Sequence, residues 1–364
     1  MTSAHHAPAV TARRLVADGQ ALPSTEELRV GAPARGELRI RAAYSMVSPG
    51  TELHYLDRSA RTGERFPLGY CSSGVVDAVG PDAPGFAQGD RVIAMSWGEA
   101  VHGDVITVPY RLCKRVPDGT DLADAVVANL AATAVHAVDR AELSAEDETV
   151  VVGAGMVGLL VAQVAAARGS RTTITDVRPA RLRAAAELGL AARDGGVLTE
   201  DGGPSSAADQ SLAAGPSPAG GRCVFMCGAG DASATVADAA RWAARASGRP
   251  RLVGVGRFAA HIDFSVELGN LDIRYAARCG AGYRDPSYAR GLTDVTAPPG
   301  EGTVTENLGR ALGLVSSGHV RADRMGLPRL PFQRAASAYT ELRERPAHPT
   351  VLFAYEPPGT EDTW

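Results

Sequence analysis

Residues 148–187 read ETVVVGAGMVGLLVAQVAAARGSRTTITDVRPARLRAAAE. The apolar, β-branched run at 149–152 predicts a buried strand, and three glycines follow it as G-x-G-x-x-G. Residues 159–168 then predict a helix, and 171–175 predict a second strand that ends on Asp176. This order predicts a dinucleotide-binding unit within a doubly wound parallel sheet. A glycine turn in another α/β fold is the alternative.

Each glycine of the motif has a physical role in such a unit. Gly153 permits the tight turn, Gly155 lets a pyrophosphate approach the backbone, and Gly158 lets the helix pack against the strand. The free N–H groups at the start of the helix then favour the phosphates. We therefore assign all three glycines to cofactor binding.

Asp176 indicates which dinucleotide binds. Its carboxylate is placed to accept hydrogen bonds from the adenosine ribose hydroxyls, and it would repel the 2′-phosphate of NADP. NAD is therefore expected, with NADP the less favoured cofactor. Arg178 and Arg181 leave NADP open, because either side chain could reach a phosphate.

Composition and charge narrow the class of protein. The 364 residues are enough for two domains, and a net charge of −4 without a basic block speaks against nucleic acid or anionic membrane as a partner. The first residues show no apolar signal region, and the five cysteines are scattered and odd in number. A cytoplasmic protein is expected. The apolar window 150–167 is interpreted as a buried strand–turn–helix, not as a membrane span.

The rest of the chain divides into β-rich ends and an α/β centre. Residues 1–122 predict a mostly β domain of short strands, and 121–138 predict a helix with Asp121 as its N-cap. Residues 194–221 predict a mobile surface loop with one short element. The predicted strands are 37–43, 74–79, 91–95, 104–108, 222–226, 251–255, 271–282 and 350–355, and the predicted helices are 232–246, 303–317 and 332–345.

The motifs in this order resemble the medium-chain dehydrogenase/reductase superfamily. PLGYCSSGVVDAVGPDAPGFAQGDRV (67–92) resembles its "GHE…G-V-V…V-G…F-x-x-G-D-R-V" signature, and HGDVITVP (102–109) resembles its "HAEYVVVP" strand. The resemblance implies a GroES-like catalytic domain (1–122 and 322–364), a Rossmann domain (123–321), an active site between them and a homodimer. It also implies cofactor contacts from Met156, Val157, Thr133, Arg181 and Gly228.

The catalytic zinc site of the superfamily is altered in this chain. Aligning SPGTELH (48–54) on "C-G-S/T-D-x-x-H" puts Pro49 at the first ligand position, Tyr70 replaces the histidine of "GHE", and Asn129 takes the third position. The four-cysteine structural zinc cluster is also missing from 97–103. We expect no zinc, and a rearranged site from Cys71, His54 and Glu52 is the alternative.

Other features resemble a zinc-less branch that includes bacteriochlorophyllide dehydrogenase-like and sugar or cyclitol dehydrogenase-like proteins. The triplet GTE (50–52) and the segment GAGYRDPSY (280–288), similar to "GR-Y-D-P-x-Y", carry this looser resemblance. A substrate cleft is further expected to draw on a set of aromatic and polar residues, namely Tyr44, Trp97, Tyr283, Arg284, Asp285 and Tyr288.

Without zinc, a side chain must handle the alcohol proton. Tyr70 is the first candidate, and its pKa would have to fall from about 10 or it would need a partner. His54 is a second candidate base, and Thr51 and Glu52 complete the expected catalytic group. Tyr70 alternatively only fills the space of the metal, Glu52 alternatively only bonds the backbone, and His102 and His136 are interpreted as structural.

The sequence thus predicts a zinc-independent, NAD-dependent oxidoreductase. Its expected substrate is a small molecule with a secondary alcohol, such as a sugar, cyclitol or related natural-product intermediate, or the matching ketone. One alternative is an NADPH-dependent reductase of enone or quinone double bonds, which Asp176 disfavours. Another is a dinucleotide-binding relative without catalysis.

Overall fold

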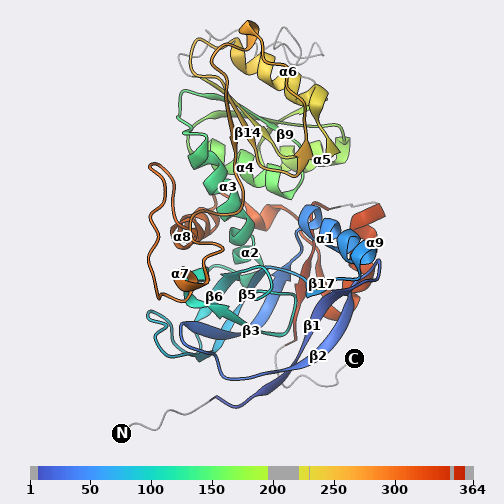
Figure 1. The fold of residues 1–364 in the computed structure, drawn as a ribbon, viewed down its shortest axis with the longest axis vertical. Coiled ribbons are helices and arrows are strands. Elements are labelled where there is room, and N and C mark those ends of the chain that lie inside the picture. The colour runs from blue at the N-terminus through green and yellow to red at the C-terminus, as the bar shows by residue number, and fades with distance from the viewer. Residues whose placement is uncertain (1–6, 196–220, 229, 345–347, 357–364) are drawn as a thin grey trace.

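The computed structural model describes residues 7–195, 221–228, 230–344 and 348–356, which form two lobes (Figure 1). One lobe is a parallel sheet with helices on its faces, and the other is mostly antiparallel β-structure. This is the α/β class with a β-rich domain that the sequence predicts. Most of the predicted loop 194–221, residues 196–220, lies outside the described residues.

The parallel sheet has six strands in the order β11-β10-β9-β12-β14-β16. All neighbouring pairs are parallel, and the order reverses at β9, where the glycine motif begins. The strands are β9 (Glu148–Val152), β10 (Arg171–Asp176), β11 (Ala191–Asp194), β12 (Arg222–Met226), β14 (Arg251–Gly254) and β16 (Asp272–Tyr275). In such sheets the ligand binds at the carboxyl ends of the strands, at the reversal point.

Three helices cover this sheet: α4 (Met156–Ala167), α5 (Pro179–Glu187) and α6 (Ser233–Ala244). Helix α4 begins three residues before the predicted start at 159, because Gly155 already serves as its N-cap. The predicted strand 271–282 is wrong beyond Tyr275. The chain turns there, and Gly280 has a φ of +122°.

The β-rich lobe contains two sheets. The larger has the order β17-β18-β3-β5-β6-β8, with β7 paired to β3, and the smaller has the order β2-β1-β4. Strand β18 pairs antiparallel with β3. This late segment of the chain therefore returns to the β-rich lobe, as predicted. The domain boundaries near 122 and 322 stay a prediction. The strands are β1 (Val10–Asp18), β2 (Ser24–Val30), β3 (Glu37–Met46), β4 (Arg65–Pro67), β5 (Cys71–Val79), β6 (Arg91–Met95), β7 (Val105–Pro109), β8 (Cys113–Arg115), β17 (Arg329–Pro331) and β18 (Leu352–Ala354).

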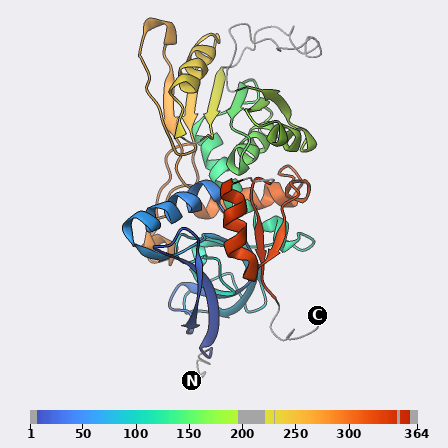
Figure 2. The same cartoon turned by 90° about the vertical axis from the view of Figure 1, so that its right-hand side faces the viewer.

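Helix α1 (Pro49–Thr62) corrects the expectation that 1–122 holds only short strands. Pro49 occupies the first turn, where its missing N–H costs nothing, and Gly63 closes the helix with a φ of 72°. Leu56 is buried against the core that includes Leu15 and Phe353. Figure 2 shows α1 at the junction of the lobes, beside α9 (Ala335–Glu344).

The predicted helix 121–138 is two helices, α2 (Leu122–Ala125) and α3 (Ala128–Arg140). The Asp121 carboxylate accepts a hydrogen bond from the N–H of Ala123, which confirms the predicted N-cap. By length and composition Leu122–Arg140 could cross a membrane, but 83% of that window is buried inside the protein. It is thus placed like a core helix.

We call residues 276–303 the strap. In Figure 1 this orange segment descends from the parallel sheet to the β-rich lobe, where α7 (Pro286–Ala289) lies beside β6. Arg290 of the strap pairs with Glu37 and Glu99, and Asp294 pairs with Arg111. The chain then returns as α8 (Val304–Ser316), which packs on α3 and is capped by Thr303. The strap therefore ties the two lobes together.

Two short strands and four 3₁₀ turns complete the described structure. They are β13 (Gly230–Asp231), β15 (Phe258–Ala259), Tyr110–Leu112, Val266–Leu268, Ala322–Arg324 and Phe332–Arg334.

Candidate active site

The glycine turn after β9 leaves open space at the start of α4. Gly153 has a φ of +102°, and a Cβ on Gly158 would lie 1.8 Å from the Gly153 carbonyl oxygen. A Cβ on Gly155 would meet only the Arg181 guanidinium, at 3.9 Å. The turn thus requires glycine at 153 for its backbone conformation and at 158 for close packing. Gly155 faces open space. These residues fit the pyrophosphate of a dinucleotide.

Asp176 ends β10 beside this turn, as predicted. Its Oδ2 accepts a hydrogen bond of 2.8 Å from the N–H of Ala154, and its Oδ1 accepts one of 2.9 Å from the N–H of Arg178. Arg181 pairs with Oδ2 at 3.3 Å. The carboxylate is therefore fixed against the glycine turn, with one cation beside it.

The other predicted cofactor residues come from three places. Met156 and Val157 open α4 directly after the glycine turn, and Met156 is buried. Gly228 follows β12 two residues after its end, next to β9. Thr133 is half-buried on α3. The structure thus gathers the first three at the carboxyl ends of β9 and β12 and leaves Thr133 on the helix that joins the lobes.

Tyr70 lies directly before β5 and is buried. Its hydroxyl donates a hydrogen bond of 2.7 Å to Ser48 Oγ, and the Thr51 hydroxyl lies close to it. Burial raises the pKa of Tyr70 far above its usual value, and the nearby Cys71 raises it further. The fall in pKa that a phenolate base requires is therefore not found; the phenol is neutral, with hydroxyl partners.

Glu52 does not bond Tyr70. Its Oε1 accepts a 2.6 Å hydrogen bond from the N–H of Ser48, and its Oε2 lies 2.8 Å from His102 Nε2 and accepts a hydrogen bond from the Tyr339 hydroxyl. All three side chains are fully buried. Glu52 therefore bonds the backbone, as the alternative predicts, and also two buried side chains; this network fixes Ser48, the residue that receives the Tyr70 hydrogen bond.

This network continues to the C-terminal strand region. His102 Nδ1 lies 2.7 Å from Ser45 Oγ, which lies 2.7 Å from the hydroxyl of Tyr355. Sequence patterns did not reveal it, because residues 45, 52, 102, 339 and 355 meet only in the folded chain.

The three positions of the superfamily's zinc ligands carry an unsuitable set of donors. Pro49 has no side-chain donor, Tyr70 is bonded to hydroxyls, and the Asn129 amide donates to the carbonyl of Ser72. Among the residues the structure describes, no group of three His, Cys, Asp or Glu is placed to hold a metal. The alternative site from Cys71, His54 and Glu52 is therefore not assembled. The residues present do not fit a zinc ion.

His54 lies one turn beyond Thr51 on α1 and is half-buried. Burial lowers its pKa, and the positive charges of Arg257 and Arg61 lower it further. Its ring meets Tyr55 edge-on, with centroids 5.5 Å apart. His54 is thus a neutral imidazole at neutral pH on the same helix as Thr51.

An aromatic row joins this helix to Tyr70. The ring centroids of Tyr55 and Trp97 are 4.5 Å apart, and those of Trp97 and Tyr70 are 5.9 Å apart. Phe66 packs against both Tyr55 and Trp97. Tyr55, Phe66 and Trp97 are each half-buried, so the row keeps partly exposed faces.

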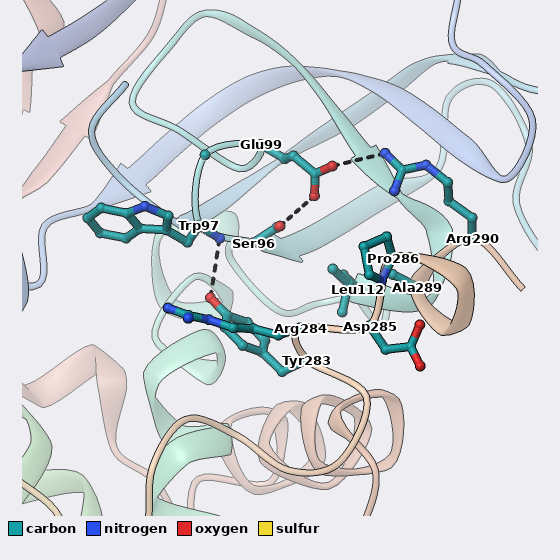
Figure 3. Close-up of a pocket in the computed structure, with 11 residues that line it drawn as sticks. Ser96, Trp97, Glu99, Leu112, Tyr283, Arg284, Asp285, Pro286, Ala289 and Arg290 are labelled. Atoms are coloured by element: carbon teal, nitrogen blue, oxygen red, sulfur yellow. Dashed lines mark hydrogen bonds and ion pairs between the residues drawn. The ribbon is translucent and has the colours of Figure 1, made fainter. Parts of the chain in front are cut away.

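A cavity of about 330 Å³ lies between residues 96–99 and the strap (Figure 3). Four of the predicted cleft residues line it, and the N–H of Trp97 donates a 3.2 Å hydrogen bond to the hydroxyl of Tyr283. The other two do not: Tyr288 is buried against Thr305, and Tyr44 lies under Arg329. The lining residues from the predicted set are Trp97, Tyr283, Arg284 and Asp285.

Solved structures with the same fold include an NADH-bound alcohol dehydrogenase (rspB) of Escherichia coli CFT073. It superposes with a TM-score of 0.71 at 17% identity, over 95% of this chain and 99% of that one. The fold is that of the medium-chain dehydrogenases. No protein-family profile matches the chain.

Curated relatives are similar in sequence to parts of this chain. A 2-dehydro-3-deoxy-L-galactonate 5-dehydrogenase of Pseudoalteromonas atlantica is 27% identical over 187 residues, which are 44% of this chain and 54% of the relative. The spectinabilin polyketide synthase system protein NorB of Streptomyces orinoci is 30% identical over 258 residues, 70% of this chain and 10% of that protein. The chain thus spans about half of the first relative. The similarity to each of these relatives is therefore partial.

Proposed function

We propose that the protein is a zinc-independent, NAD-dependent dehydrogenase that oxidises a secondary alcohol of a sugar, cyclitol or related intermediate, or reduces the ketone. One observation carries the proposal. The buried hydroxyl of Tyr70, at the position of a superfamily zinc ligand, donates a hydrogen bond to the Ser48 hydroxyl, and the Thr51 hydroxyl lies close to it. Three further points support this substrate class. Thr51 and His54 match the hydroxyl and histidine that relay the alcohol proton in the superfamily's zinc enzymes. Other features resemble the zinc-less branch, and the first relative is named for a sugar acid.

The nicotinamide, when bound, supplies the hydride acceptor or donor. The protein must move one proton. As the alcohol is oxidised, its proton passes to the Tyr70 oxygen while the Tyr70 proton passes along its hydrogen bond to Ser48 Oγ. Such a relay leaves the phenol neutral, in keeping with its raised pKa. Ser48 in turn gives its own hydroxyl proton to Thr51, Thr51 gives its proton to the neutral imidazole of His54 on the same helix, and His54 releases it to solvent.

A second candidate is the reductase of an activated double bond. The neutral Tyr70 hydroxyl is also a suitable proton donor to the carbon or oxygen of an enone. Asp176 disfavours it to the extent that such reductases use NADPH.

Absorbance at 340 nm separates the two candidates. We expect a rise when the protein and NAD are mixed with a panel of sugar and cyclitol alcohols. Consumption of NADPH with an enone panel, and no rise with any alcohol, would replace the first proposal with the second. No change in absorbance in either assay would favour a dinucleotide-binding relative without catalysis.

The preference for NAD is proposed to rest on Asp176. Replacing Asp176 with Ala and the exposed Val177 with Arg removes the repelling carboxylate and adds a cation. The ratio of kcat/KM for NADP to that for NAD should rise at least about tenfold, as charge-assisted contacts are worth roughly 1.5–3 kcal/mol. The matched control is Glu146→Ala, an exposed acid before β9, which should leave the ratio unchanged. An unchanged ratio in the double variant would remove Asp176 from this role.

We further propose a cytoplasmic homodimer with a small-molecule substrate and neither nucleic acid nor membrane as a partner. The support for the dimer is the edge strand β16, whose Ile273 and Tyr275 are 42% and 56% exposed. Phe264 and Val266, shortly before it, are 77% and 91% exposed. Unpaired strand edges with apolar side chains invite pairing with a second chain.

A further inference from the structure

The exposed Arg257 reaches from the nucleotide-binding lobe to helix α1 of the other lobe. It follows β14, at the carboxyl end of the parallel sheet, and its guanidinium lies 5.9 Å from the ring centroid of Tyr55 on α1. The backbone before it is held firmly. Gly256 bonds the carbonyl of Met226, and a Cβ there would lie 2.2 Å from the Gly228 oxygen. The position of Arg257 is therefore set by the sheet that binds the cofactor.

The charge of Arg257 has no acidic partner among the residues that the structure describes. Asp57 on α1 and Glu64 just after it have other partners: Asp57 pairs with Arg343, and Glu64 pairs with Arg58. Arg58 also lies 5.9 Å from the Tyr55 ring. The result is an uncompensated positive charge over a half-buried aromatic ring.

This cation lies over Tyr55, at the opposite end of the aromatic row from Tyr70. Tyr55 contacts Trp97, and Trp97 contacts Tyr70. The phosphates of the dinucleotide already have the start of α4 and Arg181, which lie at β9 and β10. Arg257 comes instead from β14, on the other side of β12.

We propose that Arg257 binds the acid group of the substrate, which is a sugar acid or sugar phosphate and not a neutral polyol. This inference rests on the proposed function, because it assumes that the reacting carbon lies at Tyr70. The aromatic row takes the C–H face of the sugar, and Arg257 forms a charge-assisted pair with the carboxylate or phosphate. Arginine suits both anions, because its planar fork bonds two oxygens at once.

Isothermal titration calorimetry tests the proposal without requiring turnover. The full-length protein, saturated with NADH, is titrated with galactonate, galactitol 1-phosphate and galactitol. We expect at least one anion to bind about tenfold or more tightly than galactitol. Comparison of the two anions shows whether the site takes a carboxylate or a phosphate.

The variant Arg257→Gln should abolish this preference while the Kd for NADH stays within about twofold of the wild type. Arg115→Gln, at an exposed arginine on β8, is the matched control and should retain the preference. Equal binding of galactitol and both anions would overturn the proposal. A loss of NADH affinity in Arg257→Gln with the anion preference intact would also overturn it, since Arg257 would then serve the cofactor phosphates.

The proposed function can fail separately from this subsite. If an anion binds through Arg257 and no alcohol is oxidised in the 340 nm assay, the subsite stands and the dehydrogenase proposal falls. If alcohols are oxidised and no anion preference exists, the dehydrogenase stands and the subsite falls.

Discussion

Replacing Tyr70 with Phe should lower kcat about a hundredfold, since a positioned proton-transfer group contributes roughly 10²–10⁴-fold to rate. The substitution removes only the hydroxyl that donates to Ser48 and leaves the ring packed near Trp97. Affinity for NADH should hold, because the glycine turn and Asp176 lie in the other lobe. The measurement is steady-state kinetics at 340 nm, paired with a titration of NADH.

Two further variants sharpen this result. Ser48→Ala should lower kcat by a smaller factor, because the Tyr70 hydroxyl and the nearby Thr51 hydroxyl both remain. Tyr44→Phe, at a tyrosine that lies under Arg329, should leave kcat unchanged. A Tyr70→Phe rate within threefold of the wild type would show that Tyr70 only fills space.

Replacing Glu52 with Ala should lower the free energy of unfolding by about 3–5 kcal/mol, the usual cost of removing one partner from a buried charged network. The substitution leaves three buried groups without their acceptor: the Ser48 N–H, His102 Nε2 and the Tyr339 hydroxyl. Equilibrium unfolding in urea, followed by circular dichroism, gives the free energy from the midpoint and slope.

The matched control for Glu52 is an acid in an exposed pair. Glu64→Ala breaks the ion pair with Arg58, whose side chains are 47% and 46% exposed, and should cost less than about 1 kcal/mol. Glu52→Gln keeps an acceptor oxygen and should lie between the two. A loss below about 1 kcal/mol for Glu52→Ala would show that water replaces the carboxylate.

The nucleotide-binding lobe could be predicted closely because its signals are local. An apolar strand, three glycines and Asp176 occupy consecutive positions, and the structure places them as β9, the turn, α4 and β10. Helix α1 could not be predicted in the same way. Its apolar residues are few, and its burial comes from packing on strands that are distant in sequence, such as the one that holds Leu15.

The candidate catalytic group could be predicted only in part, and its roles stay a prediction. Tyr70 and Thr51 do lie close together, and the hydrogen bond of the Tyr70 hydroxyl goes to Ser48. Glu52, which follows Thr51 in the sequence, bonds His102 instead of Tyr70. Helix α1 directs residue 52 into the core, while residue 51 is only partly buried. The opposite burial of residues 51 and 52 follows from their places on the helix, and the sequence predicts short strands and turns in this region.

The strap limits how modular the molecule is. Its anchors, Glu37, Glu99 and Arg111, belong to the β-rich lobe, although the strap itself begins at the last strand of the parallel sheet. A chimera that exchanges the nucleotide-binding half for that of another dehydrogenase would therefore inherit a foreign strap with no matching anchors. Residues 276–303 have to be kept with their anchors, so the natural unit of exchange is larger than the parallel sheet and its helices.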